Sequence, residues 1–98
     1  MAQRITNDKG FKIISMSTEE VQALGWGLDE GTMCMSCDNI INKNKESIYI
    51  ACLNDFMCKE CYEKWLSTAK RFFDDIPFED RNLNYAEYTL KELGYEVK

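Results

Sequence analysis

Cys34-Met35-Ser36-Cys37 and Cys58-Lys59-Glu60-Cys61 are the two stretches of this 98-residue sequence that decide its fold. In each, two residues separate the cysteines, and this spacing lets a tight turn direct both sulfurs toward one ion at about 2.3 Å. Residues 38–57 separate the pairs, a distance typical of a zinc site with four thiolate ligands. We therefore expect Cys34, Cys37, Cys58 and Cys61 to bind one Zn²⁺, and we expect it to be structural because four ligands close its coordination shell.

The same cysteines are compatible with three other roles. They can be buried small hydrophobic residues, disulfide partners or the ligands of a rubredoxin-like iron site. Paired spacing that occurs twice in a short chain disfavours the first role, and a reducing compartment disfavours the second. Rubredoxin-like iron sites usually have a glycine after each cysteine pair, where this chain has Asp38 and Tyr62. Zinc is therefore the preferred ion.

Composition limits the chemistry available to the chain. It has five cysteines and no histidine, which excludes ordinary Ser-His and Cys-His catalysis and any zinc site with a histidine ligand. No carboxylates stand out as an acid–base couple, because Asp74-Asp75 is typical of a helix end and Glu79-Asp80 of a helix start. We therefore predict no enzymatic activity. The length predicts a single domain, residues 1–98, whose small core benefits from a metal crosslink.

Targeting and membrane signals are absent from the sequence. The amino-terminal residues lack the apolar stretch of a secretory signal, and the apolar run at residues 48–53 is far shorter than the roughly 20 residues of a membrane span. We expect a cytoplasmic protein with no membrane partner. The odd number of cysteines also points away from a disulfide framework.

Strand and helix signals precede the first cysteine pair. Residues 11–16 are apolar and rich in β-branched side chains, which predicts a strand. Ser17 and Glu20 have the spacing of a capping box, so we expect a short helix that ends at Gly25. The glycine-rich residues 25–31 then form a loop that leads to the first cysteine pair.

Between the cysteine pairs, residues 38–57 predict a β-hairpin. Its arms are residues 40–41 and 47–52, joined by the polar turn 42–46. Cys52, the fifth cysteine, falls on the second arm, and strand alternation places it on the same face as Ile48 and Ile50. We interpret Cys52 as a buried free thiol, while a reactive thiol and a substitute metal ligand stay open.

Apolar periodicity becomes helical after Cys58. One helix is expected to continue through Phe73 until residues 74–77 stop it, and its apolar positions are Tyr62, Trp65, Leu66, Ala69, Phe72 and Phe73. A last helix starts between Glu79 and Asn84 and ends at Gly94, with its apolar stripe at Leu83, Ala86, Leu90 and Leu93. We expect an α+β fold in which this carboxy-terminal extension, residues 77–94, packs on the preceding helix.

A cysteine turn, a β-hairpin and a second cysteine pair that opens a helix resemble a treble-clef zinc finger. The resemblance covers residues 32–73 and is carried by Cys34, Cys37, Cys58 and Cys61. LIM, RING-like and several ribosomal or phage zinc modules share this arrangement. Complete LIM and RING modules bind two zinc ions through eight ligands, so the likeness is to one half of such a module.

Three functions are compatible with a single-zinc finger. We expect a non-catalytic protein-interaction or regulatory module, with candidate anchors at Trp26, Tyr85, Tyr88 and Tyr95. The first alternative is nucleic-acid binding, for which residues 43–71 supply the cations Lys43, Lys45, Lys59, Lys64, Lys70 and Arg71. The remote alternative is a thiol redox protein that uses Cys58 and Cys61, although the βαβ context of such enzymes is missing.

Net charge separates these functions. The chain carries a charge of −5, and four thiolates around one Zn²⁺ would bring it to about −7. So acidic a protein is poorly suited to neutralising phosphates. Charge therefore favours a protein partner over a nucleic acid, and we expect no small-molecule substrate.

Overall fold

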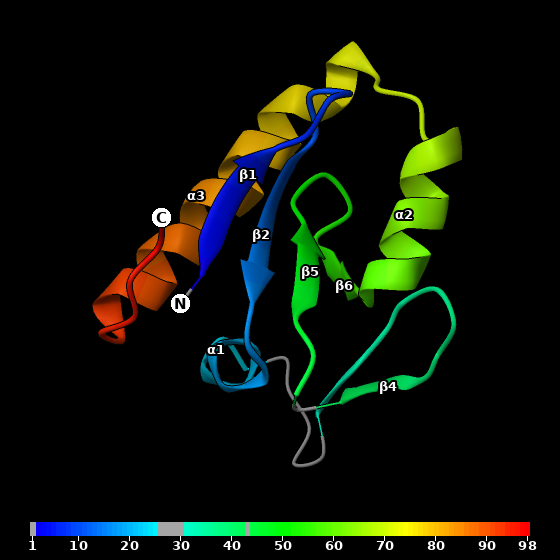
Figure 1. Ribbon diagram of the computed structural model, residues 1–98. Helices are drawn as coiled ribbons and strands as arrows, with labels where there is room; N and C mark the ends of the chain where they lie inside the picture. Colours follow the sequence, from blue (N-terminus) through cyan, green and yellow to red (C-terminus); the bar gives the residue numbers. More distant parts are fainter. Residues whose placement is uncertain (1, 26–30, 43) are drawn as a thin grey trace.

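An antiparallel sheet forms the centre of the computed structural model, which describes residues 2–25, 31–42 and 44–98. Its strand order is β1-β2-β5-β6, and a separate two-stranded sheet pairs β3 with β4 (Figure 1). The strands are β1 (Gln3–Thr6), β2 (Lys12–Met16), β3 (Gly31–Met33), β4 (Ile40–Asn42), β5 (Ser47–Ile50) and β6 (Asp55–Met57).

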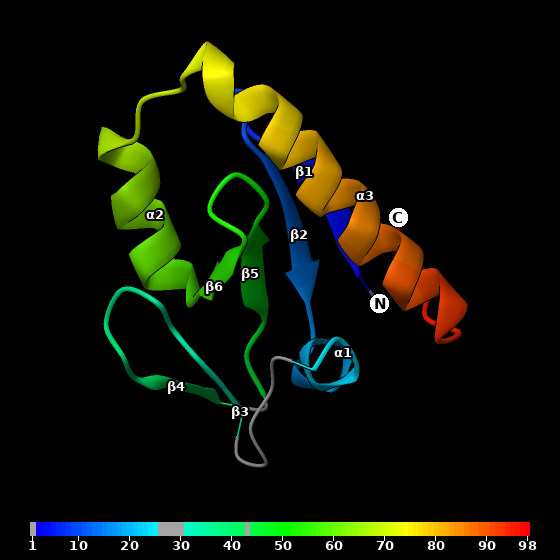
Figure 2. The same cartoon turned by 180° about the vertical axis from the view of Figure 1, so that it is seen from behind.

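Helices lie on both sides of this sheet, so the fold is α+β as expected. They are α1 (Thr18–Ala23), α2 (Lys59–Thr68) and α3 (Ile76–Glu92), and a short 3₁₀ turn, η1 (Phe73–Asp75), precedes α3. The two opposite views show α3 running along one face, across β1 and β2 (Figure 1 and Figure 2). α2 packs against β5 and β6.

Alternation along the strands divides the interior into two cores, one on each face of the sheet. The helix-side core consists of Ala2, Ile14, Met16, Val21, Tyr49, Ala51, Phe56, Leu83, Ala86 and Leu90. The cysteine-side core consists of Ile13, Cys34, Ile41, Ile48, Ile50, Met57 and Tyr62. β5 contributes to both cores because successive side chains of a strand point to opposite faces.

The strand and the capped helix predicted before the first cysteine pair are confirmed, whereas residues 26–30 of the predicted loop lie outside the described residues. The capping box of α1 is complete: the Ser17 hydroxyl accepts a hydrogen bond from Glu20 N–H (3.2 Å), and Glu20 Oε1 accepts one from Ser17 N–H (2.8 Å). Gly25 follows the helix with φ +84°, a left-handed conformation that glycine adopts without strain. The strand predicted at residues 11–16 is β2, whereas β1 has no apolar pattern that predicts it and is entirely exposed.

The predicted hairpin of residues 40–41 and 47–52 is wrong. β4 pairs instead with β3, so that Thr32 lies opposite Ile41. β5 pairs with β2 on one side and with β6 on the other, and Ile48 lies between Ser15 and Met57. β5 is buried along its whole length, which suits a central strand. A short apolar run does not by itself reveal which strand will be its partner.

The prediction that α2 continues through Phe73 is also wrong. α2 ends at Thr68, and the backbone is extended at Ala69 and Phe72. Phe72 and Phe73 are consequently 60% and 86% exposed. The extended segment brings Arg71 into a two-pronged ion pair with Glu79, whose side chain is 0% exposed (2.6 and 2.8 Å). The early end of α2 is thus accompanied by the ion pair of Arg71 with the buried carboxylate of Glu79.

α3 differs from its prediction in its start and in its position. It begins at Ile76, and Pro77 lies in its first turn, where a missing backbone N–H is harmless. Leu83, Ala86 and Leu90 are buried as expected, but Leu93 is exposed. The stripe packs on the opposite face of the sheet from α2, so the expected packing of the two helices is wrong. No helix in the described ranges is long and apolar enough to span a bilayer.

Candidate metal centre

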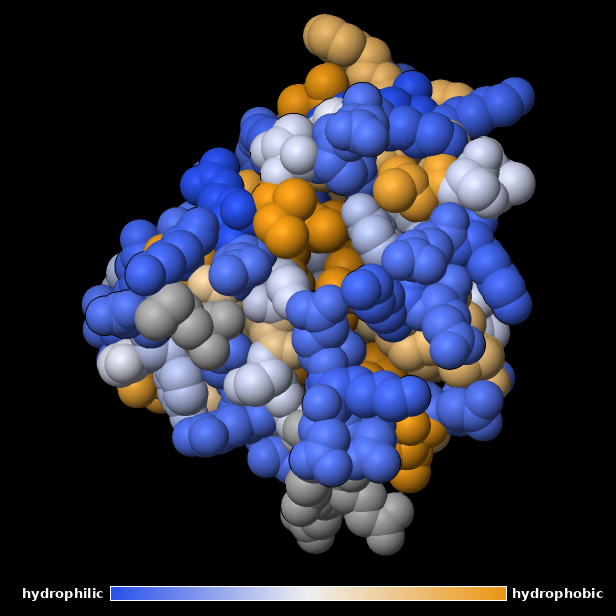
Figure 3. Space-filling model, in the orientation of Figure 1, coloured by the Kyte–Doolittle hydropathy of each residue, from blue (hydrophilic) through white to orange (hydrophobic). Residues whose placement is uncertain are grey.

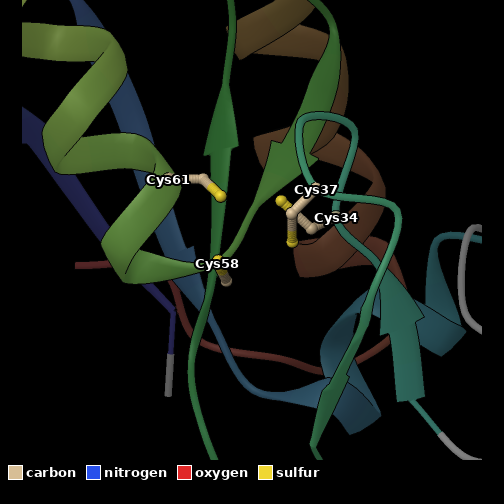
Figure 4. Close-up of side chains that lie close together, drawn as sticks. All are labelled: Cys34, Cys37, Cys58 and Cys61. Carbon is tan, nitrogen blue, oxygen red and sulfur yellow. The ribbon is translucent and has the colours of Figure 1, made fainter.

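The four paired cysteines come from two elements that the fold brings together. Cys34 and Cys37 lie in the turn between β3 and β4, while Cys58 is the N-cap of α2 and Cys61 lies in its first turn. Figure 4 shows the side chains directed toward one another across the gap between the turn and the helix. The structure therefore places together the four cysteines whose spacing predicts a metal site.

Backbone hydrogen bonds hold the cysteine turn in shape. Cys34 N–H donates to Asn39 O (2.9 Å), and Asp38 N–H donates to Cys34 O (3.0 Å), with Asp38 in the left-handed region at φ 60°. Met35 N–H donates to Phe56 O (2.9 Å), which ties the turn to β6. Since Cys58 follows β6 directly, this bond helps to fix the distance between the two cysteine pairs.

The sulfur positions suit a tetrahedral ion. All four Sγ atoms lie within 4.8 Å of one another. Zinc–sulfur bonds of 2.3 Å place the sulfurs of a regular tetrahedron about 3.8 Å apart, so a small inward movement brings the four into contact with one ion. The group can therefore hold a metal ion, and its all-sulfur donor set fits zinc.

The cysteines differ in how easily they ionise. Burial by itself raises the pKa of Cys34, but hydrogen bonds from the backbone N–H groups of Cys37, Cys58 and Ser36 stabilise the thiolate and lower the pKa to about 7. The pKa of Cys61 is raised to about 12, first by its hydrogen bond with the Cys58 thiol and then by desolvation and the other two sulfurs. One thiolate thus forms readily, and a cation is needed to ionise all four.

The surroundings of the cysteines are only partly closed. Cys34 is buried, Cys58 and Cys61 are half-buried, and Cys37 is exposed. A groove of about 560 Å³ opens beside the last three, between β4 and the start of α2.

Lysines line this groove. Within the described part of the chain, Lys45, Lys59 and Lys64 have no ion pair. Four thiolates and one divalent ion carry a net charge of about −2, so these cations partly offset the charge of the centre. Glu46 and Glu60 line the same groove, and their charges together with that of the centre outweigh the three lysines, so the groove lacks the positive excess of an anion site.

Cys52 does not belong to the metal cluster. It lies in the turn that follows β5, is half-buried, and packs against the cysteine-side core, on the face predicted for it. Burial, followed by the negative charges of Glu79 and Asp75, raises its pKa to about 11. Such a thiol stays protonated at neutral pH, which supports a free thiol over a reactive one.

The other residues singled out by the sequence are dispersed. Tyr85 and Tyr88 are exposed on α3, whereas Tyr95 is half-buried and its hydroxyl donates to Glu19 Oε1 (3.2 Å). Trp26 and Lys43 lie outside the described residues. Of the basic residues of 43–71, Arg71 is bound to Glu79 and does not face solvent freely.

Sequence reasoning missed the Arg71–Glu79 pair. Glu79 also accepts a hydrogen bond from Lys12 N–H (3.2 Å), so the carboxylate joins the segment after α2, β2 and α3. A signal was present: Glu79 stands four residues before Leu83, on the buried stripe of α3. An acidic residue at such a position requires a buried partner.

Comparisons with known proteins add no relative. No protein-family model, no curated protein and no solved structure matches this chain.

Proposed function

We propose that this chain is a non-catalytic zinc-binding domain that acts as a protein-interaction or regulatory module. The observation that carries the proposal is the convergence of four thiols, from the β3–β4 turn and the start of α2, within 4.8 Å of one another. Structural zinc sites use this donor set. Iron takes the same ligands, and the residues after the cysteine pairs, Asp38 and Tyr62, favour zinc.

Zinc would act here as a crosslink. It would join the cysteine turn, which is tied to β6 through Met35, to the first turn of α2. The cysteine turn, the β5–β6 hairpin and the cysteine pair at a helix start follow the order of a treble-clef finger with one zinc ion. The hairpin that fills this role is β5–β6 rather than the one predicted from sequence.

Three observations support a domain without catalysis. Four cysteine ligands leave no open coordination position for a substrate or a water molecule. Among the described residues, this is also the one group of His, Cys, Asp or Glu side chains placed to hold a metal. The remaining cysteine, Cys52, has a pKa of about 11 and is a poor nucleophile.

The exposed side chains favour a protein partner over a nucleic acid. Large hydrophobic residues face solvent at Phe72, Phe73, Phe78, Tyr85 and Tyr88. Figure 3 shows hydrophobic side chains projecting at the end of the molecule where η1 lies. Exposed aromatic residues are common anchors of protein interfaces. Among the basic residues of 43–71, Arg71 pairs with Glu79 inside the chain and is therefore not available to a phosphate. We also propose a cytoplasmic location, where the thiols stay reduced.

Native mass spectrometry with and without a chelator tests the metal. We expect one zinc ion per chain, lost on chelation and lost in the Cys58→Ser variant. Cys52→Ser is the matched control, since this cysteine is outside the cluster, and it should keep its zinc. An unmodified chain that binds no zinc would overturn the proposal.

Filter binding of labelled DNA and RNA at two salt concentrations tests the partner class. If the chain is a protein-interaction module, it should retain the labelled nucleic acid on the filter at neither salt concentration. Retention that falls steeply with salt would instead support phosphate contacts and the nucleic-acid alternative.

A further inference from the structure

The outer face of α3 carries an ordered row of side chains that nothing in the described chain covers. Its members are Phe78, Arg81, Tyr85, Tyr88 and Glu92, and we call them the α3 seam. The three aromatic residues are 55%, 72% and 64% exposed. The seam lies opposite the buried stripe of Leu83, Ala86 and Leu90, and Figure 2 shows the ribbon of α3 uncovered on this side.

The spacing of the seam is that of a helix–helix contact. Its members follow one another at alternating intervals of three and four residues, the repeat that keeps side chains on one line along an α-helix. A stable surface helix needs only its inner face to be apolar. Three large aromatic residues on the outer face are therefore not required by the fold.

The charges of the seam are complementary to the same seam turned end to end. In an antiparallel pair of helices with its twofold axis between Tyr85 and Tyr88, Tyr85 lies opposite Tyr88 of the second copy. The same register places Arg81 opposite Glu92 of the second copy, and symmetry repeats both contacts. A parallel pair would instead place Arg81 against Arg81 and Glu92 against Glu92.

Both charged members are available for this contact. Within the residues that the structure describes, neither Arg81 nor Glu92 forms an ion pair. The Arg81 guanidinium lies over the Phe78 ring, 5.3 Å from its centre, which leaves its N–H groups free to meet a carboxylate.

Neighbouring charges beside the seam are already neutralised within the chain. Asp80 pairs with Lys12 (2.5 Å), and Glu87 pairs with both Arg4 (3.2 Å) and Lys91 (3.3 Å). The seam charges are thus the unpaired ones on this side of α3, and they match each other only in the antiparallel register.

We propose that two copies of this chain associate through the α3 seam as an antiparallel, twofold-symmetric dimer. The inference rests on the proposed interaction role and names its partner, a second copy. The contact lies on the opposite face of the sheet from the cysteine centre, so the metal stabilises the fold without taking part in the interface. Because one helix pair is a small interface, we expect a dissociation constant that is roughly micromolar.

Sedimentation velocity of the zinc-loaded full chain over a range of concentrations tests the dimer. Arg81→Glu and Glu92→Arg should each weaken association by about tenfold or more, because each converts two attractive pairs into two repulsive ones. An equimolar mixture of the two variants should form heterodimers, and the double variant R81E/E92R should dimerise again. Asn84→Ala, exposed on α3 but outside the seam, is the matched control and should dimerise normally.

Each outcome has a clear meaning. A chain that stays monomeric at every concentration, or a dimer that the charge exchanges leave unchanged, overturns the α3 interface. Zinc content measured on the same samples separates this failure from that of the proposed function. Zinc-loaded monomers would leave the metal-binding domain standing, whereas a chain without zinc would contradict that proposal instead.

Discussion

The two faces of the central sheet are closed by different chemistry. On the helix-side face, α3 is 17 residues long and buries Leu83, Ala86 and Leu90 against Ile14 and Tyr49. On the cysteine-side face, α2 has 10 residues, of which Tyr62 is buried, and β3 and β4 have three residues each. Among the described residues, the cysteine-side core thus has seven buried residues against ten in the helix-side core.

This difference indicates which half of the fold a bound metal would stabilise most. A domain of this size buries too little surface for a large stability margin, so a weakly packed half requires another source of free energy. The cysteine-side core contains the thiol of Cys34, and Cys58 and Cys61 pack against it, whereas the helix-side core contains Leu83 and Leu90. We therefore expect the cysteine-side face to depend on the metal and the helix-side face to depend on packing.

Removal of the metal should have the largest effect. Zinc in small finger domains contributes roughly 10–16 kcal/mol of apparent binding free energy, which is comparable to the roughly 5–15 kcal/mol stability of a typical domain. Treatment with a chelator, or Cys58→Ser, should abolish the cooperative thermal transition followed by circular dichroism. Cys52→Ser should retain it. An unchanged melting temperature after complete loss of zinc would show that the cysteine-side face closes without a crosslink.

Loss of the ion pair between Arg71 and Glu79 should have the second-largest effect on stability. Arg71→Ala leaves the carboxylate of Glu79 buried without its partner, which should lower the free energy of unfolding by about 3–5 kcal/mol in chemical denaturation. The double variant R71M/E79Q should recover much of this loss because no buried charge is left. Lys70→Ala is the control, because within the described residues this exposed lysine has no carboxylate partner. Equal effects of Arg71→Ala and Lys70→Ala would contradict the assigned role.

Truncation of a buried side chain of α3 should have a somewhat smaller effect on the free energy of unfolding. Leu83 is 1% exposed, so Leu83→Ala should cost about 3 kcal/mol through the cavity that it leaves. Leu66→Ala on the half-buried face of α2 should cost about half as much. Zinc content should be unchanged in both. If Leu66→Ala proves the more damaging of the two, packing rather than metal dominates the cysteine-side face.

The reactivity of Cys52 gives the smallest effect. The pKa of Cys52 is about 11 against an ordinary 9.0, which lowers its thiolate fraction at pH 8 by about 100-fold. We therefore expect iodoacetamide to alkylate Cys52 about 100-fold more slowly in the folded protein than in the unfolded chain. The rate should rise with pH toward 11, because a raised pKa delays formation of the reactive anion. Mass spectrometry of zinc-loaded protein follows this reaction. Rapid labelling of Cys52 at neutral pH would show that the thiol is neither buried nor shielded by acidic neighbours.

Local signals in the sequence predicted the parts of this molecule that depend on neighbouring residues. The capping box of Ser17 and Glu20, the strand predicted at residues 11–16 (β2, Lys12–Met16) and the clustering of two cysteine pairs are all confirmed. Each depends on spacing within a few residues or on a chemical requirement that one ion imposes on four ligands.

Such local signals do not predict which elements far apart in the sequence will pack together. The apolar run along β5 fits a strand that is buried on both faces, but it does not say that β2 rather than β4 will be the neighbour. The apolar stripe of α3 fits either face of a sheet equally well. The end of α2 was missed because Phe72 and Phe73 continue its period, while the buried partner of Arg71, Glu79, lies eight residues further along the chain.

β5 has a consequence for how this domain can be divided. Ile48 and Ile50 belong to one core and Tyr49 to the other, so a single strand is shared by both halves. A fragment limited to residues 32–73 would lose β2 as the neighbour of β5 and expose Tyr49, Ala51 and Phe56 to water. Residues 32–73 are therefore not a separable unit, because one face of β5 needs the helix-side core, including α3, to cover it.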